Sequence, residues 1–175
     1  MANQRQLNGG DITISANNPK FSDLLTSPTL FLAFGFGSGL SPRAPGTVGT
    51  LMAVPLWLLL SQLSAPLYWS IILVAAILGI VICGAAAKQL QVHDHPGIVW
   101  DEFVGFWIVM PFVPQGPWSL ALGFLLFRFF DVIKPWPISL LDKKIGGGLG
   151  IMLDDVIAGI AAALVAVALN YLGYI

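Results

Sequence analysis

The side chains that could do chemistry are concentrated in a few segments of this chain. Eight of its 17 charged residues lie between Arg128 and Gly159. The charged residues that we group into one predicted site are Asp94, Asp101, Glu102, Asp131, Asp154 and Asp155, with Arg43, Arg128 and Lys134. Carboxylates crowded at low dielectric repel one another unless a cation lies among them. Oxygen ligands with few histidines or thiols favour Mg²⁺ over Zn²⁺, so the set predicts a magnesium site.

Spacing limits which of these acids can act together. Two pairs are adjacent in sequence: Asp101 with Glu102, and Asp154 with Asp155. Neighbouring residues on a helix diverge by about 100°, so we expect one acid of each pair to face the site. Arg128, Asp131 and Lys134 are three apart and share a helix face, which Pro135 should end.

Simpler structural roles for the same residues remain open. Arg128 and Asp131 could form an ordinary ion pair at i,i+3. Asp154 or Asp155 could stabilise the start of the last helix, where the helix dipole favours acids. His93 and His95 flank Asp94 and could carry protons, although two loop histidines are more often simply exposed. Lys143 and Lys144 are expected in a solvated loop near anionic lipid head groups.

Composition places these residues at a membrane. The 175 residues are 57% hydrophobic and 10% charged, with a mean hydropathy of +0.83, which indicates an integral membrane domain rather than a soluble helical core. A net charge of -1 excludes a basic surface for nucleic acid. Cys83 is the one cysteine, so neither a disulfide framework nor a thiolate metal cluster is possible, and we expect it to be packed as a small hydrophobic residue.

The N-terminal third begins with polar sequence and then becomes irregular. Residues 1–28 are expected to form a polar, partly mobile tail without a signal peptide's apolar core, and an interfacial helix is possible over 21–34. Glycines and prolines between 30 and 50 predict a broken or re-entrant segment. There, Arg43 and free backbone N–H groups could hold a phosphate, or the segment could be a flexible lead-in to the first span.

Charge-free runs predict about five short transmembrane or re-entrant helices in a single domain over 29–175. Residues 51–87 should form two spans joined at 61–66, and 103–127 should form a hairpin of two short helices broken by three prolines. Each arm of that hairpin is short unless 100–102 and 128–131 extend it. The last span is expected over 156–175. The predicted fold class is therefore an all-α integral membrane protein.

With five spans, the charged segments 1–50, 88–102 and 128–155 all lie on one side of the membrane. All eight Lys and Arg residues then face one compartment, which the positive-inside rule assigns to the cytoplasm. The acidic site is therefore expected at the cytoplasmic face.

Four motifs carry a family resemblance: G-F-G-S-G-L-S-P-R-A-P-G-T-V-G-T-L (35–51), D-H-P-G-I-V-W-D-E-F-V-G (94–105), F-R-F-F-D-V-I-K-P-W-P-I (127–138) and G-G-L-G-I-M-L-D-D-V-I-A-G (147–159). Together they resemble the phosphatidylglycerophosphatase A family of bacteria, over roughly 28–172. The resemblance implies a multi-pass, Mg²⁺-dependent lipid phosphatase of the inner membrane that hydrolyses phosphatidylglycerophosphate to phosphatidylglycerol and phosphate.

The resemblance also implies roles for individual residues. The implied catalytic residues are Asp101, Glu102, Asp131, Asp154 and Asp155; these five and Asp94 are the implied metal ligands; and Arg43, Thr47, Arg128 and Lys134 are the implied phosphate-binding residues. Our hypothesis is that one or two Mg²⁺ ions activate a water for in-line attack, with a covalent aspartyl-phosphate as the alternative. A small ion or solute transporter with an acidic cation site is the alternative function.

Overall fold

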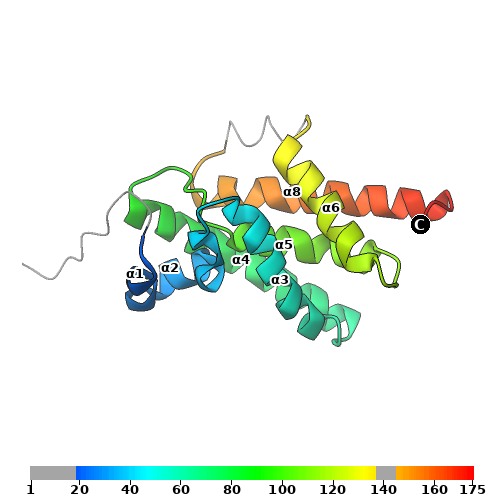
Figure 1. The fold of residues 1–175 in the computed structure, drawn as a ribbon, viewed down its shortest axis with the longest axis horizontal. Coiled ribbons are helices and arrows are strands. Elements are labelled where there is room, and N and C mark those ends of the chain that lie inside the picture. Colours follow the sequence, from blue (N-terminus) through cyan, green and yellow to red (C-terminus); the bar gives the residue numbers. More distant parts are fainter. Residues whose placement is uncertain (1–18, 137–144) are drawn as a thin grey trace, which may run out of the picture.

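A computed structural model of the chain describes residues 19–136 and 145–175 (Figure 1). Within these ranges every regular element is helical and no β-strand occurs. The helices are α1 (Phe21–Thr26), α2 (Pro28–Ala33), η1 (Gly35–Leu40), α3 (Pro45–Leu60), α4 (Ala65–Leu90), α5 (Trp100–Val109), η2 (Met110–Phe112), α6 (Ser119–Ile133) and α8 (Gly147–Tyr171). Most of the predicted tail, and the predicted loop lysines Lys143 and Lys144, lie outside the described residues.

The helices before α3 are short because residues with non-helical backbone conformations separate or distort them. In place of one interfacial helix over 21–34, the structure has α1 and α2, separated by an extended Ser27 whose side chain caps α2. The irregular segment is confirmed: η1 is distorted by Phe36 (φ 60°) and Gly37 (φ 99°), and a new helix starts at Pro45. This break leaves the N-terminal end of α3 beside the predicted site.

Among the described residues, two helices are long and apolar enough to cross a bilayer. α4 has 26 residues and α8 has 25, so each is about 38 Å long, against about 30 Å of hydrocarbon. Only 33% of the most apolar stretch of α4 is buried, although the core helix of a soluble protein would be mostly buried. The exposed apolar surface of α4 therefore favours a membrane environment.

The predicted hairpin over 103–127 is present, as α5 with η2 followed by α6. Both helices extend into the polar flanks: α5 starts at Trp100 and α6 ends at Ile133. α5 has only 10 residues, so it is about 15 Å long and reaches only about halfway through a bilayer. All of its residues from Asp101 to Val109 are buried, because α3, α4, α6 and α8 pack around it (Figure 1).

The contact between α5 and α8 is close because two glycines face each other. A Cβ atom at Gly159 would lie 2.5 Å from the carbonyl oxygen of Gly105, and one at Gly105 would lie 2.7 Å from the carbonyl oxygen of Asp155. Real Cβ atoms do not come so close to backbone oxygens, so the two helices approach at a distance that larger residues would prevent. The acids at the start of α5 are thereby brought against those of α8.

The last helix starts earlier than predicted. The sequence placed its first residue near Val156, whereas α8 begins at Gly147, because the glycine-rich segment before the acids is itself helical. Asp154 and Asp155 consequently lie in the third turn of α8 and are both buried. The helix-capping role considered for them is therefore wrong, since the dipole effect is confined to the first turn.

Candidate active site

A polar cavity of about 290 Å³ brings together five separate parts of the chain. They are the residues at the start of α3, the loop 94–98, the first turn of α5, the end of α6, and the third turn of α8. Eight of the predicted site residues line this acidic cavity: Asp94, Asp101, Glu102, Arg128, Asp131, Lys134, Asp154 and Asp155. Arg43 is exposed and Thr47 is half-buried, and neither is among the lining residues.

Three aspartates form the centre of the cavity. One carboxylate oxygen each from Asp101, Asp154 and Asp155 lies within 4.8 Å of the other two, and all three residues are buried. The expectation that only one acid of an adjacent pair faces the site is therefore wrong for Asp154 and Asp155. The close packing of α5 on α8 explains this, because Asp101 is near enough to be reached from two positions about 100° apart on α8.

These aspartates have the features of a cation site. Oδ1 of Asp101 and Oδ2 of Asp155 are buried, and neither has a hydrogen-bond partner among the described residues. Carboxylate oxygens are the ligands that Mg²⁺ prefers, and one oxygen from each of the three residues lies within 4.8 Å of the others. Burying carboxylates without hydrogen-bond partners destabilises the folded protein. A divalent cation bound between them would offset their mutual repulsion and would coordinate the oxygens that have no partner. The residues present therefore fit a hard divalent cation.

Glu102 belongs to a different set of contacts from its neighbour Asp101. Its Oε1 lies 3.3 Å from Nη1 of Arg128, and its Oε2 accepts a hydrogen bond of 2.9 Å from Thr50. The same guanidinium nitrogen of Arg128 donates to Oδ2 of Asp131. Arg128 and Asp131 thus form the i,i+3 pair considered as a structural role, but Arg128 also joins α6 to α5 at the wall of the cavity.

Lys134 lies at the end of α6, opposite Asp154. Its ammonium group donates to Oδ2 of Asp154, which links the end of α6 to α8. Its backbone is left-handed (φ 43°) and its N–H bonds to the carbonyl oxygen of Phe130 at 2.9 Å, so the helix ends at this residue. Pro135 explains the ending, since the residue before a proline is disfavoured in helical conformation. The sequence-based prediction that the helix ends at Lys134 is confirmed.

The loop between α4 and α5 contributes one buried histidine. His93 and Asp94 are exposed, whereas His95 is buried and its ring lies 5.4 Å from that of Phe34. Nδ1 of His95 accepts a 3.0 Å hydrogen bond from the N–H of Gly97. Burial lowers the pKa of His95, although the Asp94 carboxylate opposes this. The expectation that both histidines are simply exposed is therefore wrong for His95.

Two residues at or beside the cavity, Gly46 and Thr50, were not identified from the sequence as site residues. Thr50 is a buried partner of Glu102, and its hydroxyl also lies 3.0 Å from the carbonyl oxygen of Gly46. A Cβ atom at Gly46 would lie 2.0 Å from Oε1 of Glu102, so a larger residue there would displace that carboxylate. The glycine-rich motif and the H-D-H motif indicated that these segments are important, but they did not show which of their residues lie beside the acids.

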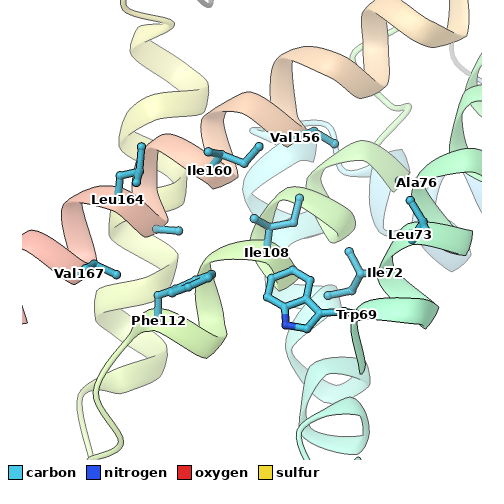
Figure 2. Close-up of a pocket in the computed structure, with 11 residues that line it drawn as sticks. Trp69, Ile72, Leu73, Ala76, Ile108, Phe112, Val156, Ile160, Leu164 and Val167 are labelled. Carbon is cyan, nitrogen blue, oxygen red and sulfur yellow. The ribbon is translucent and has the colours of Figure 1, made fainter. Parts of the chain in front are cut away.

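A second cavity has a different character. It measures about 360 Å³ and lies between α4, α5, η2 and α8, as Figure 2 shows. Its lining is apolar: Trp69, Ile72, Leu73, Ala76, Ile108, Phe112, Val156, Ile160, Ala163, Leu164 and Val167. Val156 follows Asp155 directly, but it lines this apolar cavity and is not among the lining residues of the acidic cavity. Without an ionisable group, this cavity has no means of binding a charged head group.

Comparisons with known proteins agree with the motifs. The family model for Phosphatidylglycerophosphatase A matches residues 31–170. Phosphatidylglycerophosphatase A of Escherichia coli strain K12 is 46% identical over 140 residues, which are 79% of this chain and 81% of the relative. The protein of the same name from Haemophilus influenzae is 44% identical over 160 residues, or 90% and 98% of the two chains. No solved structure matches significantly. The chain belongs to the phosphatidylglycerophosphatase A family.

Proposed function

We propose that this protein removes the terminal phosphate from phosphatidylglycerophosphate, giving phosphatidylglycerol and inorganic phosphate, and that it does so at the acidic cavity with Mg²⁺ bound. The observation that carries the proposal is the convergence of three buried aspartates with Arg128 and Lys134 in one cavity. Both relatives above are named as phosphatases of this lipid class. The transporter alternative is therefore not favoured.

The metal ligands that we propose are Asp101, Asp154 and Asp155. Mg²⁺ held there would supply Lewis-acid stabilisation of the negative charge on the phosphoryl oxygens. Asp131 and Glu102, which were also predicted as ligands, instead contact Arg128. Asp94 lines the cavity but is exposed. We therefore assign these three acids to the outer wall of the site.

The cationic residues account for phosphate binding. A lipid phosphomonoester is a dianion near neutral pH, and an Arg or Lys lining the cavity lowers the free energy of binding it. Glu102 and Asp131 hold the guanidinium of Arg128 in one orientation, and Asp154 holds the ammonium of Lys134. Preorganised cations stabilise charge that develops in the transition state without a reorganisation cost. The residues around the cavity are thus suited to stabilising the charge of phosphoryl transfer, and we propose that water is the attacking group.

We propose that the cavity faces the cytoplasm of a bacterium, in a multi-pass inner-membrane protein. The turn between α3 and α4, the loop before α6 and the C-terminal end all lie toward the right of Figure 1, away from α1, α2 and the end of α4. Residues 61–64 and 113–118, which form these two connections, contain no charged side chain. The positive-inside rule then places the Lys- and Arg-containing end at the cytoplasm.

The test is release of inorganic phosphate from phosphatidylglycerophosphate in detergent micelles, with Mg²⁺ or with EDTA. We expect release by wild type that needs Mg²⁺ and that falls at least about 100-fold (about 2.7 kcal/mol) in Asp155→Asn. A folded wild type that releases no phosphate would refute the proposed activity, and flux measurements in proteoliposomes would then test the transporter alternative. Undiminished release in EDTA would refute the metal.

Water attack and a covalent aspartyl-phosphate are distinguished by a separate experiment. Acid quenching during turnover of substrate labelled with ³²P in its terminal phosphate would trap a phospho-aspartate, which is stable in acid. Direct attack by water predicts label in inorganic phosphate and none in the protein. Labelled protein that forms and decays at the rate of turnover would overturn the proposed water mechanism.

A further inference from the structure

We propose that His95 donates the N–H of its Nε2 atom to a phosphoryl oxygen of the substrate, so that it binds the phosphate directly. This inference rests on the proposed function, since it assigns a further residue to the same cavity. The family motif drew attention to the acids of this segment, and the role of the histidine follows from the geometry around its ring.

The hydrogen bond on the other ring nitrogen fixes which nitrogen carries the proton. Nδ1 of His95 accepts the N–H of Gly97 at 3.0 Å, and an acceptor nitrogen in a neutral imidazole has no proton of its own. The proton is therefore on Nε2, at the opposite edge of the ring. Within the described part of the chain, no hydrogen bond joins Nε2 to another residue. The donor is thus available to a ligand.

The surroundings hold the ring in place beside the cavity. His95 is only 6% exposed, packs on Phe34, and is one of the cavity's lining residues. The carbonyl oxygen of His95 accepts the N–H of Ile98 at 2.8 Å, and the N–H of Val99 bonds to the carbonyl oxygen of Ala33 at 2.8 Å. These hydrogen bonds fix the loop 94–98 against α2, so the loop and the His95 ring lose little conformational entropy when a ligand binds.

The donor is of a kind that the cavity otherwise lacks. Among its described lining residues, the carboxylates only accept hydrogen bonds, and Arg128 and Lys134 each already contact a carboxylate. His95 is the one lining side chain there that is a neutral donor. A phosphomonoester has three acceptor oxygens, and the cations and a metal do not satisfy every lone pair on them. A neutral imidazole can act as such a fixed electrophilic donor without transferring its proton.

Two substitutions separate the two edges of the ring. In His95→Gln the side-chain amide reaches the position of Nε2 and keeps a donor there, whereas in His95→Asn the amide reaches only the position of Nδ1. We expect kcat/KM for phosphate release to fall about 100-fold in His95→Asn and to stay within about fivefold of wild type in His95→Gln. The same pair at His93, which is exposed, should leave the activity unchanged. Equal losses in both His95 variants, or wild-type activity in His95→Asn, would overturn the proposal.

A measurement on the unmodified protein covers the case in which the variants fail to fold. The chain has only 2 histidines, so ¹⁵N-histidine labelling gives a simple spectrum. We expect His95 to be the Nε2–H tautomer, and its Nε2 proton to shift when inorganic phosphate is added with Mg²⁺. The Nδ1–H tautomer, or no shift under phosphate saturation, would overturn the inference. This measurement does not depend on hydrolysis of the lipid. It can therefore show that the role proposed for His95 is wrong independently of whether phosphatidylglycerophosphate is the substrate.

Discussion

Arg128 of α6 lies 3.3 Å from Oε1 of Glu102 of α5, and this contact separates two acids that are adjacent in sequence. Asp101 faces the aspartates of α8, while Glu102 turns toward α6 and α3. A cation between Glu102 and Asp131 compensates charges that would otherwise repel those of the aspartate cluster. The cavity thus has a triple-aspartate side, suited to a metal, and an arginine side, suited to a phosphate.

Replacing Arg128 by lysine should lower kcat/KM for phosphate release about 10- to 100-fold. The planar guanidinium can contact two carboxylates and a phosphate at once, whereas the ammonium of lysine lacks this fixed fan of donors. The Mg²⁺ concentration that gives half-maximal activity should change little, since the proposed metal ligands Asp101, Asp154 and Asp155 are untouched. Activity assays over a Mg²⁺ series measure both quantities. A large rise in that Mg²⁺ concentration would show that Arg128 instead supports the aspartate cluster.

Replacing Asp155 by asparagine should raise the melting temperature of the metal-free protein, because it removes one of three mutually repelling buried carboxylates. It should also abolish the stabilisation by Mg²⁺, which for wild type is about 2.7 kcal/mol when the ion is at 100 times its dissociation constant. Thermal unfolding in micelles with EDTA and with Mg²⁺ measures both effects. A variant that Mg²⁺ stabilises as strongly as wild type would exclude Asp155 as a ligand.

Asp94 provides the matched comparison for Asp155, because it lines the same cavity but is exposed and lies outside the triple-aspartate cluster. Asp94→Asn should retain most of the stabilisation by Mg²⁺. Titration of the melting temperature with Mg²⁺ compares the two variants directly. If Asp94→Asn weakens Mg²⁺ binding as much as Asp155→Asn, the ligand set predicted from the sequence was right to include it.

Replacing Thr50 by valine should destabilise the protein by about 1 to 3 kcal/mol, since Oε2 of Glu102 loses a buried hydrogen bond. Thr50→Ser keeps the hydroxyl and is the control. Both variants are scored by chemical or thermal unfolding, and by kcat for phosphate release. If valine and serine behave alike, the loss comes from packing and the hydrogen bond to Glu102 is unimportant.

Replacing Gly159 by alanine should separate α5 from α8, because the new methyl group would lie 2.5 Å from the carbonyl oxygen of Gly105. We expect a loss of about 1 to 3 kcal/mol in stability, as for other overpacked cores, and a larger proportional loss of Mg²⁺ affinity. Gly116→Ala is the control, since nothing lies within 4 Å of a Cβ atom there. Unchanged Mg²⁺ binding in folded Gly159→Ala would contradict the link between this helix contact and the aspartate cluster.

The sequence alone determined the helical class, the break before α3, the hairpin of α5 and α6, and the set of acids and cations from which the site is built. These features follow from local properties: charge-free runs, prolines that end helices, and charged residues too few and too clustered to be incidental. The start of α8 was predicted nine residues late, because the last span was expected to begin only after the last charged residue, Asp155.

Only the tertiary structure decided which acids meet. Asp154 and Asp155 both reach Asp101 because Gly105 and Gly159 allow α5 and α8 to approach closely, and helical periodicity taken one helix at a time contains no such distance. In the same way, packing turned Glu102 toward Arg128 and buried His95 while leaving His93 exposed. Spacing along a chain fixes directions around one helix axis, whereas contacts between helices depend on how closely the axes pack.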